Sequence, residues 1–139
     1  MGHEELLAAA REVRERAYAP FSRFRVGAAA RDADGNIYSA CNVESSSYGL
    51  SICAERAAVA KAVSEGCTEL VEIAIVADTA RPCPPCGACR QLIYELGSNA
   101  RVVMANLQGE VTVAHITELL PGAFSADYLR PESSRDRDE

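Results

Sequence analysis

Two short cysteine-bearing segments, far apart in the chain, constrain its fold more than any other feature. Cys53 is followed by Ala and then Glu55, and a Pro-Cys-Gly-Ala-Cys run at residues 85–89 contains Cys86 and Cys89. Three thiols can occupy three corners of a tetrahedral zinc site and leave the fourth open for water. Glu55 would then lie beside the open corner as a proton carrier. The fold must therefore bring the two segments together.

Both cysteine segments stand at the start of a predicted helix. One helical pattern begins after residue 51 and ends at Gly66, and a second begins near Gly87 and ends at Gly97. The unpaired N–H groups and the positive dipole of a helix N-terminus stabilise thiolate, the form that binds zinc. Three thiolates leave zinc with excess negative charge. We expect Arg56 to offset that charge by hydrogen-bonding a ligand sulfur.

Cys83 leaves a second interpretation of the metal site open. It precedes Cys86 by three residues, and as a fourth thiolate it would close the site into a structural zinc centre. Because prolines on either side hold it in a separate turn, we expect Cys83 not to bind the metal. A Cys-x-x-Cys pair alone fits a structural zinc site or a redox pair as well as it fits a catalytic zinc site. The upstream Cys-x-Glu favours the catalytic site. Cys41 and Cys67 are expected to be small buried residues.

The rest of the chain predicts helices alternating with strands in one domain, residues 1–129, followed by a polar, disordered tail at 130–139. Helical spacing also covers about residues 4–18, and a short helical turn is expected at 117–120. The predicted strands are residues 25–31, 37–41, 70–77, 101–106 and 110–114. Only three residues separate the last two strands, so these must be antiparallel. This order predicts an α/β fold, a three-layer α/β/α sandwich around a mixed five-stranded sheet.

Charge and hydropathy restrict the partners of the chain. Its 14 Lys and Arg against 20 Asp and Glu give a formal net charge of −6 at pH 7, without the basic stripe that nucleic-acid binding requires. No apolar run approaches the roughly 20 residues that span a bilayer, and the acidic start is unlike a signal peptide. We therefore expect a cytoplasmic protein with reduced cysteines and a small-molecule substrate. His3 is expected to lie at a mobile terminus, and neither it nor His115 is expected to have a function.

Several motifs together resemble the small, homotetrameric type of cytidine deaminase. They are Cys-Ala-Glu-Arg at 53–56, Pro-Cys-Gly-Ala-Cys-Arg-Gln at 85–91, Asn-Val-Glu at 42–44, Tyr-Ala-Pro-Phe-Ser at 18–22, Val-Gly-Ala-Ala at 26–29 and Leu-Leu-Pro-Gly-Ala-Phe at 119–124. The likeness extends from about residue 4 to residue 129. It implies one zinc ion per subunit and the hydrolytic deamination of cytidine and 2′-deoxycytidine to uridine and 2′-deoxyuridine, a reaction of pyrimidine salvage.

The resemblance also implies roles for polar residues. Glu55 would take a proton from the water activated by zinc, deliver it to N3 of the ring and later protonate the leaving amine. Asn42 and Glu44 would hold the ribose 3′-hydroxyl, which would distinguish a nucleoside from a free base. The family pattern Asn-Val/Ile-Glu-Asn continues here with Ser45, a departure within the ribose loop.

Four further residues acquire roles by resemblance. Phe24 would stack on the pyrimidine, and Ala54 belongs to the substrate-binding set. Tyr48 and Phe124 would reach into the site of a neighbouring subunit, which would make the active form a homotetramer. Packing in the protein core is the alternative for the two phenylalanines.

Other functions remain open on the sequence alone. A related enzyme could deaminate another aminopyrimidine nucleoside, such as blasticidin S, although the Asn-Val-Glu loop at residues 42–44 favours a plain ribose. A non-catalytic zinc module with Cys83 as fourth ligand would leave Glu55 unexplained. A polynucleotide deaminase is disfavoured by the net negative charge.

Overall fold

A mixed five-stranded sheet forms the centre of the molecule in the computed structural model, which describes residues 2–129. The strand order is β2-β1-β3-β4-β5. Strands β3 and β4 are parallel, and all other neighbouring pairs are antiparallel. The bounds are β1 (Val26–Asp32), β2 (Ile37–Cys41), β3 (Leu70–Ala77), β4 (Arg101–Ala105) and β5 (Val111–His115). The predicted mixed sheet with an antiparallel last pair is confirmed; the predicted tail at 130–139 lies outside the described residues.

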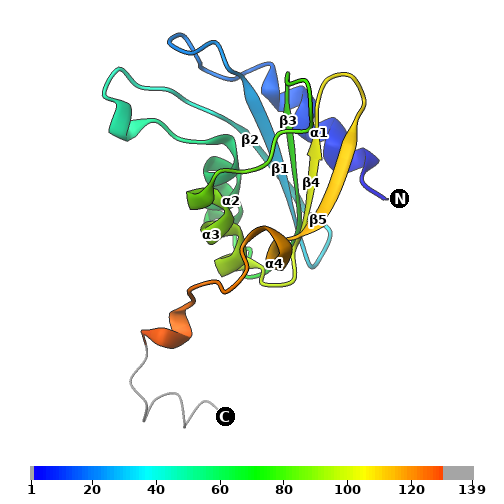
Figure 1. Ribbon diagram of the computed structural model, residues 1–139, viewed down its shortest axis with the longest axis vertical. Coiled ribbons are helices and arrows are strands. Elements are labelled where there is room, and N and C mark those ends of the chain that lie inside the picture. The colour runs from blue at the N-terminus through cyan, green and yellow to red at the C-terminus, as the bar shows by residue number, and fades with distance from the viewer. Residues whose placement is uncertain (1, 130–139) are drawn as a thin grey trace.

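Helices cover both faces of the sheet and complete the three predicted layers (Figure 1). One face carries α1 (Glu4–Arg14), and the other carries α2 (Ala54–Ser64) and α3 (Gly87–Leu96). The short α4 (Ile116–Leu119) follows β5, and single 3₁₀ turns lie at Tyr48–Leu50 and Ala126–Tyr128. Helix α3 is the crossover that parallel strands β3 and β4 require. Helices α2 and α3 therefore lie side by side, with their N-termini at the same end of the sheet (Figure 1).

Strand β3 shows why the central strands are almost continuously apolar. Ile73 and Ile75 belong to the core beneath α2 and α3, whereas Ala74 and Val76 belong to the core beneath α1. Side chains of a strand alternate between faces, so a strand covered on both sides must be apolar at every position. The two cores meet only through the sheet, which makes β3 the rigid centre of the scaffold.

Helix α1 packs so closely on β1 that a side chain is excluded. A Cβ atom built at Gly27 would lie 2.0 Å from the carbonyl oxygen of Ala10. The small residues of β1 therefore allow helix and strand to approach, as the Val-Gly-Ala-Ala run at 26–29 suggests.

The first helix ends earlier than its sequence pattern predicts. Helical spacing extends to about residue 18, but α1 ends at Arg14. Beyond it, the N–H of Tyr18 donates to the carbonyl of Asn42 at 3.0 Å, and its own carbonyl accepts from the N–H of Glu44 at 2.8 Å. These long-range hydrogen bonds pull residue 18 out of the helix and against the loop that follows β2.

The expectation that His3 lies at a mobile terminus was wrong. Its Nδ1 lies 3.0 Å from an oxygen of the buried Glu72 carboxylate, on the α1 face of β3. Arg31 and Arg101 reach the same carboxylate at 3.2 Å. The buried negative charge is thus paired, and His3 attaches the start of α1 to the sheet. His115 is the N-cap residue just before α4, where it forms a capping box with Glu118.

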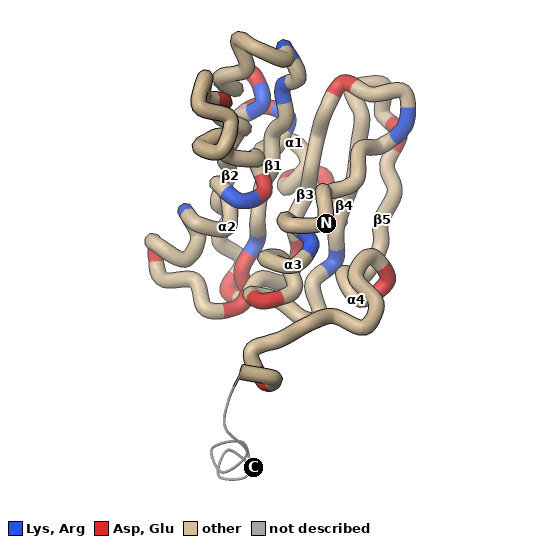
Figure 2. The backbone as a smooth tube through the Cα atoms, turned by 60° about the vertical axis from the view of Figure 1, so that its left-hand side comes forward, with Lys and Arg blue, Asp and Glu red and all other residues tan. Residues whose placement is uncertain are grey.

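Charged side chains are spread over the described residues. Lys and Arg positions are interspersed with Asp and Glu along the backbone and do not gather into one stripe (Figure 2). Within residues 2–129, no helix is both long enough and apolar enough to span a bilayer.

Candidate metal centre and adjoining cavity

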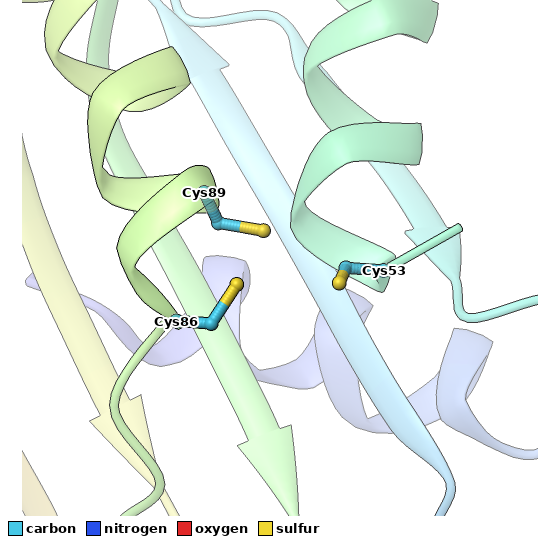
Figure 3. A group of neighbouring side chains, drawn as sticks. All are labelled: Cys53, Cys86 and Cys89. Carbon is cyan, nitrogen blue, oxygen red and sulfur yellow. The ribbon is translucent and has the colours of Figure 1, made fainter. Parts of the chain in front are cut away.

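Three cysteine sulfurs converge between the N-termini of α2 and α3. Cys53 is the residue just before α2, Cys86 is the residue just before α3, and Cys89 lies in the first turn of α3. Their sulfur atoms all lie within 4.8 Å of one another and point toward a common centre (Figure 3). The parallel crossover therefore brings together the two segments that the sequence separates by about thirty residues.

The three thiols fit a zinc ion by both chemistry and spacing. Thiolates bind zinc at about 2.3 Å, which places two ligands of a tetrahedral site about 3.8 Å apart. A cluster with sulfurs within 4.8 Å needs only a small inward movement to reach that spacing. Three protein ligands leave one corner for water, which is the arrangement of catalytic rather than structural zinc.

The local environment affects the three thiols differently. Burial raises the pKa of Cys53 and of Cys89. The backbone N–H of Cys89 lowers the pKa of Cys86, as expected for a thiol at a helix N-terminus. Without a cation, the predicted thiolate stabilisation therefore dominates only at Cys86. A divalent cation reverses the balance, because coordination deprotonates a thiol outright.

Glu55 lies one residue beyond the start of α2 and is buried. Burial raises the pKa of its carboxyl group. A raised pKa makes a carboxylate a better proton acceptor, as a group that both accepts and returns a proton must be. Glu55 lines the same cavity as Cys53 and Cys86, so a proton carrier and the thiol cluster share one space.

A cavity of about 480 Å³ opens in front of the thiol cluster. This volume falls within the range of small-molecule sites, about 300–1,000 Å³. The cavity combines sulfur and carboxyl groups with apolar walls; its lining is Phe24, Val26, Asn42, Cys53, Ala54, Glu55, Cys83, Pro84, Pro85, Cys86, Gly87 and Arg90. Phe24, Asn42 and Ala54 from the predicted substrate-binding set are among these residues.

Cys83 lies in the wall of the cavity but outside the thiol cluster. Only Cys53, Cys86 and Cys89 form a metal-sized group of ligands among the described residues. The Cys83 thiol instead faces the carbonyl oxygen of Pro84 at 3.6 Å. This placement favours the three-ligand interpretation over the closed structural site.

The expected contact of Arg56 is absent in the described part of the chain, where its guanidinium makes no hydrogen bond to a cysteine sulfur. Protonated thiols are weak acceptors, so such a contact depends on the charged form of the sulfur. Arg90 is the cation that sequence reasoning missed. It lines the cavity, and it donates to the carbonyls of Pro85 and Leu119, each at 2.8 Å. Its position directly after Cys89 was the available signal.

Asn42 is buried at the cavity wall and holds the start of β1. Its Oδ1 accepts from the N–H of Val26 at 2.9 Å, and its Nδ2 donates to the carbonyl of Phe24 at 2.8 Å. An amide side chain has two donors and two acceptor positions. One N–H and one lone pair of Asn42 therefore remain for a ligand.

Glu44 lies in a neighbouring hollow that it shares with Tyr48 and Ser22, not in the lining of the main cavity. Its Oε1 accepts from the N–H groups of Phe21 at 2.9 Å and Ser22 at 3.1 Å, and its Oε2 accepts from the Ser22 hydroxyl. The hydrogen bond from Ser22 is the main reason that the pKa of Glu44 lies below its usual value. The carboxylate is thus charged and fixed in orientation.

The two remaining aromatic candidates are far more exposed than core residues. Tyr48 is 80% exposed and Phe124 is 52% exposed. Phe124 stacks on Tyr128 with ring centroids 5.7 Å apart, and its carbonyl accepts from Gln91 of α3 at 2.9 Å. Neither ring lines the main cavity of its own chain. Core packing is therefore excluded for Phe124, and Phe24, at 42% exposure, is also outside the core.

Comparisons with known proteins agree with this site. The family model for the cytidine and deoxycytidylate deaminase zinc-binding region matches residues 1–106. Cytidine deaminase of Halalkalibacterium halodurans is 51% identical over 130 residues, which cover 93% of this chain and 98% of that protein. Cytidine deaminase of Sporosarcina psychrophila is 47% identical, over 93% of this chain and 96% of its own.

A solved structure gives the same result for the fold. The crystal structure of cytidine deaminase from Burkholderia pseudomallei matches with a TM-score of 0.86 and 48% identity, covering 89% of this chain and 100% of that chain. The family model covers the thiol cluster, the acidic residue beside it and most of the sheet. The chain therefore belongs to the cytidine and deoxycytidylate deaminase family.

Proposed function

We propose that this chain is a zinc-dependent enzyme that hydrolyses cytidine and 2′-deoxycytidine to uridine, 2′-deoxyuridine and ammonia, as in pyrimidine salvage. The observation that carries the proposal is the convergence of three thiols and a buried carboxyl group on one cavity of nucleoside size. Family membership supports the substrate class, because the relatives described above are named cytidine deaminases.

In this proposal, Cys53, Cys86 and Cys89 hold one zinc ion per chain. When bound, the ion supplies Lewis-acid activation of a water molecule for attack on C4 of the ring. Glu55 accepts the proton that this water loses and donates it to N3. It then accepts the proton of the hydroxyl group now on C4 and transfers it to the exocyclic amine; the C4–N bond breaks, ammonia leaves and C4 becomes a carbonyl. The burial of Glu55 excludes bulk water from this proton path.

The remaining candidates orient the nucleoside. Asn42 offers its free N–H and lone pair to the sugar, and Glu44 accepts from a sugar hydroxyl. Phe24 stacks on the ring, and Ala54 forms the floor beside it. A donor and an acceptor placed for a sugar would reject a free base, because their hydrogen bonds would then be unmade.

The proposal includes a homotetramer in a reducing, cytoplasmic environment. Its support is that the exposed aromatic residues are grouped: Phe124 stacks on exposed Tyr128, and Tyr48 shares a 3₁₀ turn with exposed Leu50. Contiguous exposed apolar side chains indicate contact surfaces. Tyr48 and Phe124 would each complete the site of a neighbouring chain, and Arg56 would contact a thiolate once the metal is bound.

The decrease of cytidine ultraviolet absorbance on adding protein tests the proposal directly. We expect turnover with cytidine and 2′-deoxycytidine, its loss on treatment with a chelator, and its return on adding zinc. Blasticidin S measured in parallel tests the nearest alternative, and a single-stranded oligonucleotide tests a polynucleotide substrate. Turnover that survives complete removal of metal would refute the zinc-dependent mechanism.

A further inference from the structure

The segment at residues 18–26, a loop that leads into β1 and presents Phe24 to the cavity, is held by the loop that follows β2. Asn42 binds its C-terminal end, through Phe24 and Val26. Glu44 binds its middle, through the N–H groups of Phe21 and Ser22. Asn42 and Glu44, which are expected to bind the sugar, therefore also fix the segment that carries Phe24, which is expected to stack on the base.

The Ser22 hydroxyl lies at the junction of these contacts. A carboxylate can only accept, so the single hydroxyl hydrogen of Ser22 must point to Oε2 of Glu44. The N–H of Phe24 can only donate, and it lies 3.0 Å from the same hydroxyl oxygen. One hydroxyl group thus links the Glu44 carboxylate to the backbone of Phe24, with its donor and an acceptor both in use.

The backbone between Ser22 and Phe24 needs such a link. Arg23 has a φ of 62°, and it is the one non-glycine residue with positive φ in the described chain. This left-handed conformation is unfavourable for a side chain with a Cβ, so it persists only where surrounding contacts hold it. The Ser22 hydroxyl closes the turn on one side, and the N–H of Arg23 donates to Ala19 at 2.9 Å on the other.

Ser22 also determines how much of the Glu44 carboxylate is free. Each carboxylate oxygen offers about two acceptor positions. Oε1 accepts two N–H groups and Oε2 accepts the Ser22 hydroxyl, so one position on Oε2 remains. Without the hydroxyl, the carboxylate would keep only its two Oε1 contacts and could rotate about them.

We propose that Ser22 is a positioning residue for the nucleoside: its hydroxyl fixes the sugar-binding carboxylate of Glu44 and the ring-stacking position of Phe24 in a single arrangement. The inference rests on the proposed function, which assigns the sugar to Glu44 and the base to Phe24. Ser22 itself needs no contact with the substrate. Because it acts on binding groups and lies apart from the thiols, it should affect KM far more than kcat.

Ser22→Ala, Ser22→Thr and the exposed-surface control Ser98→Ala test the proposal in the zinc-loaded enzyme. For Ser22→Ala we expect KM for cytidine to rise about tenfold, the effect of one hydrogen bond to a charged group, with kcat within about twofold. Ser22→Thr keeps the hydroxyl and should stay within about threefold of the wild type. Zinc content should be equal in all three variants, and Ser98→Ala should match the wild type.

A double-mutant cycle with Glu44→Ala distinguishes positioning from a general structural role. If Ser22 acts partly through Glu44, Ser22→Ala should raise KM by clearly less in the Glu44→Ala background than in the wild type. Calorimetric titration with uridine should give the same pattern in the dissociation constant without relying on turnover.

Three results would overturn the role of Ser22: an unchanged KM in Ser22→Ala, a threonine variant as poor as alanine, or full additivity in the cycle. Each of these results compares KM between variants of an enzyme that is active on cytidine. A wild-type enzyme that does not deaminate cytidine would instead refute the proposed function. The two failures are therefore distinguishable.

Discussion

The two walls of the cavity are built in opposite ways. The wall with the thiols, here called the thiol wall, comes from the N-termini of two packed helices, and its Glu55 and the adjoining thiol of Cys89 are buried. Another part of the lining comes from the loops before β1 and after β2, here called the loop wall, and Phe24 on it is 42% exposed. Local stability follows buried contacts, so the thiol wall should be rigid and the loop wall should depend on added contacts.

This difference separates the part of the site that one chain assembles by itself from the part that one chain leaves open. The three sulfurs meet without help from outside the chain. The aromatic residues expected on the nucleoside side, Tyr48 and Phe124, do not line the cavity of their own chain. In the proposed homotetramer, the thiol cluster would be assembled within one chain, and neighbouring chains would complete the substrate enclosure that Phe24 and Asn42 begin.

The largest effect should follow from breaking the thiol wall. Cys86→Ala should lose zinc and activity, because two thiols cannot replace the three-ligand site. With free zinc about 1,000-fold above its Kd, the lost binding corresponds to about 4 kcal/mol of unfolding free energy. Metal analysis and chemical denaturation with and without zinc measure both effects.

Cys83→Ala is the matched control for that substitution. Its thiol lines the same cavity but lies outside the cluster, so zinc content should be unchanged. Loss of zinc from Cys83→Ala, with retention by Cys86→Ala, would show that the ligand assignment is wrong.

Glu55→Gln should separate the chemistry of the thiol wall from its structure. The amide has nearly the same shape but cannot carry a proton, so kcat should fall by about 10³-fold or more while zinc content is unchanged. Glu65→Gln, at the exposed far end of α2, is the control and should be fully active. Near-normal turnover by Glu55→Gln would remove this residue from the proton path.

A mixing experiment tests whether the loop wall is completed by another chain. Phe124→Ala alone should lower kcat/KM by about tenfold, the loss of an aromatic contact. Refolded together with Glu55→Gln in equal amounts, roughly a quarter of the sites in a random tetramer would combine an intact Glu55 with a neighbour's intact Phe124. Activity should then exceed the sum of the separate parents. A simple sum would indicate that Phe124 acts in its own chain.

The sequence predicted the elements that a local pattern determines, and it missed the contacts between residues far apart in the chain. The predicted strand at 70–77 has the bounds observed for β3, because burial on both faces leaves a continuous apolar run. The helices beside the thiols were also predicted, because helical spacing indicates where they begin and Gly66 and Gly97 indicate where they end. In contrast, the bonds of Ser22 to Glu44 and of His3 to Glu72 join residues 22 and 69 positions apart. No local pattern encodes such contacts.

The smallest effect on catalysis should come from the end of β1 farthest from the cavity. There the buried Asp32 carboxylate accepts from the hydroxyl of Tyr38 at 2.8 Å and from backbone N–H groups of Asp34 and Asn36 at 2.9 Å. Burial alone would raise the pKa of Asp32, but these hydrogen bonds together outweigh it and lower that pKa below its usual value. The hydrogen bond to the Asp32 carboxylate is the main reason that the pKa of Tyr38 is raised to about 12.

Tyr38→Phe should therefore reduce stability in a pH-dependent way and leave KM for cytidine within about twofold. The lowered pKa of Asp32 gives stability that is present above its unfolded value, about 3.9, and is lost as the pH falls further. The raised pKa of Tyr38 gives stability that is present below about 10 and lost as the pH rises through about 12. The melting temperature of wild type should thus exceed that of Tyr38→Phe between these limits and converge with it outside them, while Tyr94→Phe serves as control. If KM rose along with the loss of stability, the hairpin end and the loop wall would be mechanically coupled through β1, and a rise in KM alone would not distinguish the positioning role of Ser22 from a general loss of stability.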